Sequence, residues 1–225
     1  MNNRWDYCNS KSLNNTISKY KFKREYEFIT KYGEKNLNKI LDIAGGSGHL
    51  AIPLSQFSSD ITIVDVSEAA IKQLHEKNSK IKAIHSDFTS AQITAKFSLI
   101  ICIESICYFD DIDAFIFKVK NLMKADGVFV LSCVNPKSWR YYLREISHFG
   151  NGSTPYNEFT LKELTAVLNK HGLKIDQIEG MNWIPLPLSS NSKFAKLFEL
   201  FEQVFYLKRW LAQSPWWLIS IKKSS

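Results

Sequence analysis

The chain has 225 residues, of which 45% are hydrophobic and 23% are charged, and this composition is typical of a globular protein with one sizeable core. It contains no apolar run near the ~20 residues that a membrane span requires, and its polar first residues lack the apolar core of a secretory signal. The formal net charge of +7 comes from scattered lysines, which indicates a solvated surface more than a nucleic-acid site. We therefore expect a cytoplasmic protein with no membrane span and no nucleic-acid partner.

Five apolar runs in the first 134 residues predict strands, and helical patterns separate most of them. The predicted strands are Ile40–Ala44, Ile61–Val66, Ile81–His85, Phe97–Ile103 and Gly127–Val134. The predicted helices are His49–Phe57, Ser67–Asn78 and Asp111–Met123. This alternation indicates a parallel α/β sheet, because each parallel pair of strands needs a crossover connection.

The last third of the chain predicts a helix, a strand, a second helix and a final strand. Thr160 is a good N-cap, Glu163 completes a capping box with it, and Gly172 ends the helix. A strand follows over residues 173–184, and a final strand covers residues 214–223. Between them, apolar residues at helical spacing over 192–211 predict a helix that packs on the core, closes over a substrate as a lid, or does both.

The four cysteines indicate packing rather than chemistry. They form no C-x-x-C pair, so neither a zinc knuckle nor a redox pair is predicted. Cys102, Cys107 and Cys133 lie in or beside apolar runs. We expect reduced thiols that pack as small apolar side chains.

The stretch ILDIAGGSGHLAIPLSQ, residues 40–56, places a glycine turn between the first strand and the next helix. Residues 46–51 satisfy G-x-G-x-x-[GA], which alone would predict a dinucleotide site with Asp65 on a ribose. Asp42 argues for a different ligand. An anionic pyrophosphate needs no carboxylate before the glycines, whereas a ligand with an ammonium group would be stabilised by one. Asp87, after the third strand, is placed to accept a hydrogen bond from an adenine amine.

Together these motifs resemble those of class I S-adenosylmethionine-dependent methyltransferases of the small-molecule type. The acid-x-G-x-G-x-G motif of that family matches Asp42–Gly48, except that Ala44 replaces the first glycine. Asp65, HSDF, FSLIICIES and LMKADGVFVLS supply the later motifs, so the resemblance covers residues 38–134 and extends to about 175. Because alanine carries a Cβ, we expect a negative φ at Ala44.

The resemblance implies an α/β fold, a Rossmann-like three-layer sandwich around a seven-stranded, mostly parallel sheet with an antiparallel last strand. It also implies S-adenosylmethionine as cofactor and S-adenosylhomocysteine as product. Asp65 is expected to accept from the ribose hydroxyls, and Asp87 to lie near the adenine. The expected cofactor-binding residues are Asp42, Ala44, Gly46, Gly48, Asp65, Val66, Asp87, Phe88 and Ile103.

The candidate acid–base residues are few. Glu104 ends the fourth strand, where ligands bind in open α/β sheets, and Tyr108 and His148 are the other candidates. A structural role for Glu104, as a contact of the donor or a cap of the next turn, stays open. Asp110 and Asp111 come late for a metal site and predict the start of a helix, so we expect no metal.

The acceptor pocket is expected in the least regular segments. Aromatic residues with arginine suit a flat or acidic acceptor. The expected substrate-binding residues are Tyr20, Trp139, Arg140, Tyr156 and Trp183. We expect one domain over residues 1–225, with an N-terminal helical cap (1–37), a donor-binding core (38–134) and substrate-side insertions (135–160 and 185–212).

The function expected from these residues is metal-independent methyl transfer from S-adenosylmethionine to an oxygen or nitrogen of a small-molecule acceptor, in a biosynthetic tailoring step. Two alternatives are kept: a methyltransferase that acts on nucleic acid or protein, and a non-catalytic relative that binds the donor. IESICYF follows the fourth strand without the proline-rich turn of enzymes that methylate amino groups on bases or glutamine. A monomer and a homodimer are both compatible with the sequence.

Overall fold

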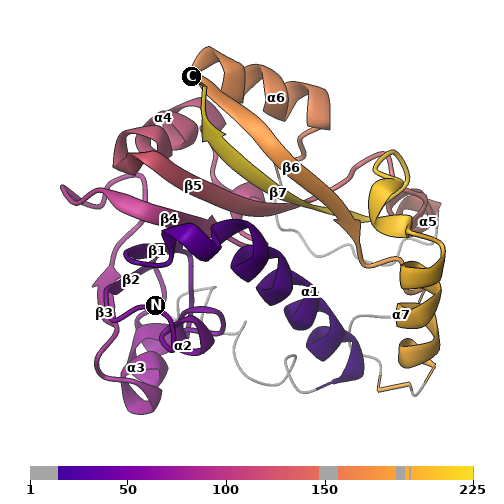
Figure 1. Cartoon of the computed structure of the whole chain (residues 1–225), viewed down its shortest axis with the longest axis horizontal. Helices are drawn as coiled ribbons and strands as arrows, with labels where there is room; N and C mark the ends of the chain where they lie inside the picture. The colour runs from indigo at the N-terminus through magenta and orange to yellow at the C-terminus, as the bar shows by residue number, and fades with distance from the viewer. Residues whose placement is uncertain (1–14, 147–156, 186–190, 193, 225) are drawn as a thin grey trace.

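The computed structural model describes residues 15–146, 157–185, 191–192 and 194–224 (Figure 1). The expected site residues His148 and Tyr156 lie outside the described residues. Seven strands form one sheet in the order β3-β2-β1-β4-β5-β7-β6. Their bounds are β1 Ile40–Ile43, β2 Ile61–Asp65, β3 Lys82–His85, β4 Phe97–Cys102, β5 Met123–Val134, β6 Leu173–Met181 and β7 Trp216–Lys223.

Strand direction confirms the expected fold class. The pairs β1–β2, β1–β4, β2–β3 and β4–β5 are parallel. The last strand, β7, lies between β5 and β6 and is antiparallel to both. The sheet order reverses at β1, since β2 and β3 lie on one side of it and β4 and β5 on the other.

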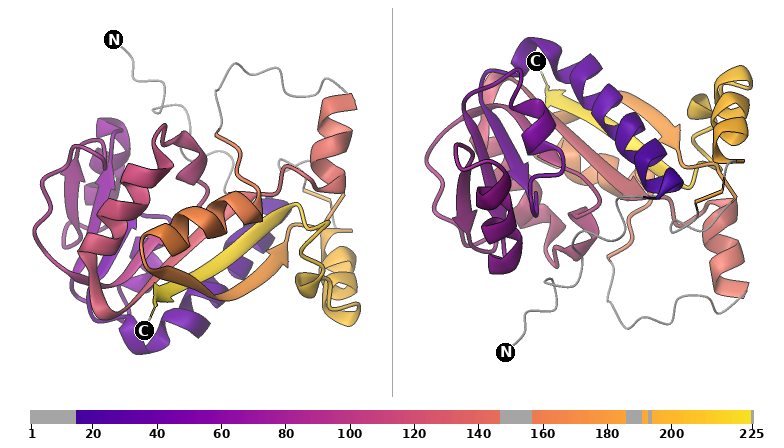
Figure 2. Two further views of the ribbon diagram at one scale, coloured as in Figure 1. Left: turned by 90° about the horizontal axis from the view of Figure 1, so that it is seen from above. Right: turned by 90° about the horizontal axis from the view of Figure 1, so that it is seen from below.

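Helices cover both faces of this sheet. Figure 2 shows α1, α2 and α3 over one face and α4 and α6 over the other. Their bounds are α1 Thr16–Gly33, α2 Ala51–Leu54, α3 Glu68–Lys77, α4 Ile112–Leu122, α5 Trp139–Ile146, α6 Leu161–Lys170 and α7 Ala195–Val204. None of the helices in the described part of the chain is long and apolar enough to cross a membrane.

The helix caps follow the local sequence closely. The Ser67 side chain accepts from the Ala70 backbone at the start of α3, and Asp111 caps α4 in the same way. The expected capping box of Thr160 and Glu163 is present at α6. One prediction was too long: the helix expected over His49–Phe57 is a single turn, because Ser55 closes it with bonds to the Ala51 and Ile52 carbonyls.

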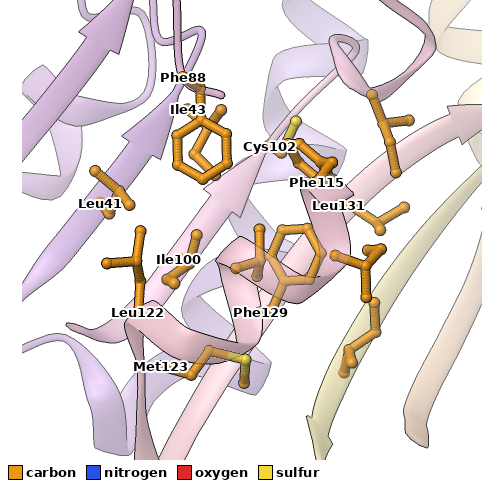
Figure 3. Close-up of a cluster of buried hydrophobic side chains, with 14 of the residues drawn as sticks. Leu41, Ile43, Phe88, Ile100, Cys102, Phe115, Leu122, Met123, Phe129 and Leu131 are labelled. Atoms are coloured by element: carbon orange, nitrogen blue, oxygen red, sulfur yellow. The ribbon is translucent and has the colours of Figure 1, made fainter. Parts of the chain in front are cut away.

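Each central strand feeds two cores because its side chains alternate between faces. In β1, Leu41 and Ile43 join the core under α4 and α6, whereas Ile40 joins the core under α1, α2 and α3. The first of these cores is shown in Figure 3. Its centre is aromatic: the Phe115 ring lies 5.3 Å from that of Phe88 and 4.4 Å from that of Phe109, between ring centroids.

We expect Phe115→Ala to lower the free energy of unfolding by about 3–5 kcal/mol, since Phe115 is fully buried and its removal leaves a cavity. Phe117→Ala on the same helix is the matched control, because that ring is 53% exposed, and we expect a change within about 0.5 kcal/mol. Urea unfolding followed by circular dichroism measures both. Equal losses in the two variants would contradict this account of the core.

Candidate functional site

Two cavities adjoin at the carboxyl ends of the parallel strands. The first, here the glycine-turn cavity, has a volume of about 380 Å³, and the second, the aromatic cavity, has about 530 Å³. Both volumes suit a small-molecule ligand. Glu104 and Tyr108 line both cavities, so they stand where the two meet.

The glycine-turn cavity is built from the segments that follow β1, β2, β3 and β4. Its lining residues are Ala44, Gly45, Gly46, Ser47, His49, Val64, Asp65, Val66, Ser67, Ala70, Ser86, Asp87, Phe88, Glu104, Ser105, Tyr108 and Phe109. The expected residues Ala44, Gly46, Asp65, Val66, Asp87 and Phe88 are among them. Their convergence follows from the fold, because the carboxyl ends of parallel strands share one edge of the sheet.

The turn after β1 needs backbone conformations that favour glycine. Gly46 has φ 55° and Gly48 has φ 80°. Ala44 has φ 56°, so the prediction of a negative φ at this alanine is wrong. The Ala44 N–H donates to the Val64 carbonyl at 2.7 Å, so this residue is still held to β2 where the chain turns. The turn therefore holds a residue with a Cβ in a strained conformation.

Gly45 is a site residue that the sequence reasoning missed. A Cβ built at this position would lie 2.6 Å from the Asp42 carboxyl carbon, so only glycine fits. Asp42 is buried behind this glycine and is absent from the lining of both described cavities. The sequence did hold a signal for Gly45: a glycine that follows a buried acid at the end of a strand leaves room for the acid's side chain against the turn backbone.

Gly48 also acts through packing rather than through the cavity. A Cβ at Gly48 would lie 2.5 Å from Leu74 of α3, so glycine lets the turn approach that helix. Ile103 lines neither of the two described cavities and packs against the core under α1 instead. Gly48, Asp42 and Ile103 therefore lie outside the lining of both described cavities.

Two carboxylates in the glycine-turn cavity accept backbone hydrogen bonds. Asp65 accepts from the Gly46 N–H at 2.7 Å and from the Ser67 N–H at 2.8 Å, which ties the end of β2 to the glycine turn. Asp87 accepts from the Thr89 N–H at 2.6 Å. Lys118 of α4 donates to the carbonyls of Phe88 and Ala91, both at 2.6 Å, and so fixes the loop that carries Asp87.

Burial gives Asp42 unusual electrostatics. Burial, together with the nearby Asp65 charge, raises the pKa of this carboxyl to about 8. Among the described residues, no group hydrogen-bonds to Asp42 Oδ2. A buried polar atom without a partner is costly, so this oxygen is suited to receive a donor from outside the chain or to hold a proton.

The aromatic cavity lies between α1, α5 and the carboxyl end of β5. Trp216 and Phe159 supply apolar walls, and Arg140, Lys21 and Glu158 supply charges. Arg140 also donates to the Ile184 carbonyl at 2.6 Å, which fixes its guanidinium at the wall. Of the expected substrate-binding residues, Arg140 lines this cavity.

Three other expected substrate-binding residues lie elsewhere. Tyr20 points to α7, where its hydroxyl donates to the Glu202 carboxylate. Trp183 is near the same helix, since its backbone N–H donates to Glu202 at 2.6 Å. Trp139, at the start of α5, is absent from the lining of both described cavities. These three residues were predicted from their aromatic side chains alone, and in the structure none of them lines the aromatic cavity.

Glu104 occupies the junction in a strained conformation. Its φ is 60°, and its backbone N–H donates to Ser132 Oγ of β5 at 2.8 Å. Its carboxylate forms an ion pair with Lys21 of α1. Sequence spacing did not reveal Lys21, because an N-terminal helix reaches this point only through tertiary packing.

No group of three or more metal-ligating side chains occurs within the described ranges.

A model of the methyltransferase domain family matches residues 15–178, which include the whole lining of the glycine-turn cavity. The chain belongs to this family. The recognition as a class I S-adenosylmethionine-dependent methyltransferase, made from the motifs, is therefore confirmed.

Individual relatives agree with this membership. Ubiquinone biosynthesis O-methyltransferase of Rickettsia akari (strain Hartford) is 26% identical over 196 residues, covering 81% of this chain and 78% of that protein. The CcbJ methyltransferase of Streptomyces caelestis has the same fold with a TM-score of 0.68 at 14% identity, covering 96% of this chain and 93% of that one. Magnesium protoporphyrin IX methyltransferase of Synechocystis PCC 6803, solved with bound SAH, gives a TM-score of 0.66 at 16% identity, covering 98% and 92%.

We expect Ala44→Gly to stabilise this methyltransferase by about 0.5–1 kcal/mol. Glycine removes the strain of an alanine at φ 56°, and the greater freedom of the unfolded chain offsets part of that gain. Gly172→Ala is the matched control, because Gly172 has φ 67° with open space around its Cβ position, and we expect the opposite sign. Thermal unfolding measures both changes in stability. A destabilised Ala44→Gly variant would contradict the backbone strain inferred at Ala44.

We expect Asp42 to make the protein less stable as the pH rises from about 5 to 8. Its pKa is about 8 in the folded state and near 4 in an unfolded chain, so in this window the folded state binds more protons. The free energy of unfolding therefore falls with rising pH. Asp42→Asn removes this contribution. Urea unfolding at pH 5 and pH 8 should therefore show a smaller fall in the free energy of unfolding for the variant than for the wild type. Asp176→Asn, at an exposed ion pair, should behave like the wild type.

Proposed function

We propose that this protein transfers a methyl group from S-adenosylmethionine to an oxygen or nitrogen of a small-molecule acceptor. The observation that carries the proposal is the pair of adjoining cavities, with Glu104 and Tyr108 in the lining of both. Such an arrangement lets two ligands meet at one point. The relatives named O-methyltransferases favour oxygen as the acceptor atom and a biosynthetic role.

The residues in and behind the glycine-turn cavity fit the donor on three observations. Asp42, buried behind Gly45, has an oxygen without a partner in the described structure, which suits a water-mediated contact with the donor's ammonium group. Gly45 lines the cavity, and a Cβ there would collide with Asp42, so glycine keeps the Asp42 carboxyl close to the turn. Asp65 and Asp87 stand at the ends of β2 and β3, where the ribose hydroxyls and the adenine amine would be held.

Much of the rate would come from positioning. S-adenosylmethionine supplies a methyl group on a positively charged sulfur, which an acceptor lone pair displaces in line. The chain's task is to hold the acceptor behind that methyl group and to exclude water. Glu104 is the proposed base for an acceptor that must lose a proton, and Tyr108 the proposed hydrogen-bonding partner beside it. His148 stays a candidate that lies outside the described residues.

The expected division of the chain also stays a proposal. Residues 1–37 would form a cap, residues 38–134 the donor-binding core, and residues 135–160 and 185–212 the substrate side, all in one domain. Two structural observations support it: α1 contributes Lys21 to the aromatic cavity, and α5 contributes Arg140.

We expect Asp65→Asn to weaken S-adenosylhomocysteine binding at least about tenfold, because the amide offers one neutral acceptor oxygen and an N–H donor where the carboxylate offers two charged acceptor oxygens. Isothermal titration calorimetry of the purified protein measures this binding. Asp60→Asn is the matched control, since Asp60 forms exposed ion pairs with Lys39 and Lys82 outside both cavities. Absence of binding in the folded wild type would contradict the proposed donor.

A further inference from the structure

The ammonium of Lys21 stands at the junction of the two cavities. It forms an ion pair with Glu104 and lies 5.1 Å from the centroid of the Trp216 ring. The Lys21 side chain is only 10% exposed. All three residues line the aromatic cavity, and Glu104 also lines the glycine-turn cavity. An acceptor bound against Trp216 would therefore have a buried cation beside the point where methyl transfer takes place.

The groups that face Lys21 come from several elements. Burial lowers the pKa of Lys21, the charge of Glu25, one turn later on α1 and 4% exposed, counteracts this, and Arg140 of α5 adds to the lowering. Burial raises the pKa of Glu25 to about 7, although Lys21 counteracts this. Lys21 also lowers the pKa of His49, in addition to burial and Lys77. Near neutral pH, Glu25 is therefore partly protonated, and the cations of Lys21 and Arg140 share the cavity wall with the carboxyl groups of Glu104 and Glu158.

We propose that Lys21 determines acceptor specificity by stabilising an ionised hydroxyl oxygen bound against Trp216. The aromatic cavity would then take acceptors with an acidic hydroxyl, such as phenols, in preference to amines. This inference rests on the proposed function of the site and deepens it. The chemistry that favours oxygen is electrostatic: an amine gains positive charge during methyl transfer, and a fixed ammonium beside it repels that charge.

The proposed step balances in atoms and charge. The acceptor hydroxyl gives its proton to the Glu104 carboxylate and becomes an oxyanion that the Lys21 ammonium stabilises. The oxyanion's electron pair forms the new bond to the methyl carbon, and the electrons of the breaking carbon–sulfur bond go to sulfur. Glu104 then returns its proton to solvent. The step requires Lys21 to keep its charge, which burial opposes and which the charge of Glu25 and the ion pair with Glu104 favour.

The test uses 4-nitrocatechol, a phenol whose ionised form absorbs at a longer wavelength than its neutral form. The full-length protein is first saturated with S-adenosylhomocysteine, which is checked by calorimetry, and the probe is titrated below its free pKa. We expect the bound probe to show the spectrum of the ionised form. We expect Lys21→Met to weaken binding of the ionised form about tenfold, equivalent to one pKa unit.

Two further variants separate the proposed role from a structural one. Lys21→Arg keeps the positive charge and should restore the ionised spectrum at least in part. Lys19→Met removes an exposed lysine of the same helix and should bind the probe like the wild type. Methylation of the probe is then compared with methylation of 4-nitroaniline, and the preference for the phenol should fall in Lys21→Met.

The outcomes distinguish the two proposals. If the wild type binds S-adenosylhomocysteine but holds the probe in its neutral form, the role of Lys21 is overturned and the donor site stands. An ionised spectrum that is unchanged in folded Lys21→Met also overturns it. If the wild type fails to bind S-adenosylhomocysteine, the proposed function fails first. A Lys21→Met variant that does not fold leaves the wild-type spectrum and Lys21→Arg as the deciding measurements.

Discussion

The reversal of strand order at β1 is the constraint on which the site depends. β1 pairs with β2 on one side and with β4 on the other, so the connections that leave these strands diverge at one edge of the sheet. The space between diverging connections is where ligands bind in open α/β sheets. The glycine turn after β1 and Glu104 after β4 face each other across this space. The glycine-turn cavity follows from that topology, whereas the aromatic cavity also needs α1, α5 and β7.

Strained backbone and a buried carboxyl occur together at this edge. Ala44 directly follows β1, Glu104 comes shortly after the end of β4, and both have positive φ values. Both strands are fully buried. Their conformations persist because backbone hydrogen bonds to Val64 and Ser132 hold them. Asp42 adds a carboxyl that burial keeps protonated over much of the neutral range. The strained backbone at Ala44 and Glu104 and the buried carboxyl of Asp42 each cost free energy, which the packed cores on both faces of the sheet offset.

The sequence predicted the parts of this protein that depend on local pattern. Alternating apolar runs located the central strands, and Ser67, Asp111 and Thr160 marked helix starts that the structure confirms. The motif residues of the glycine-turn cavity were found because each follows a strand end. The φ of Ala44 was predicted wrongly, since the turn's geometry is set by pairing with β2 rather than by the preference of alanine.

The acceptor side was less predictable because it is assembled from distant segments. Tyr20 and Trp183 were chosen for their aromatic rings, yet both lie against α7 through Glu202. Lys21, the next residue after Tyr20, reaches the aromatic cavity instead, since neighbouring residues on a helix point about 100° apart. Two consecutive residues of α1 therefore contact different partners: Tyr20 contacts Glu202 of α7, and Lys21 contacts Glu104. Only the packing of α1 on the sheet decides which of the two faces the site, and sequence spacing carries no information about that packing.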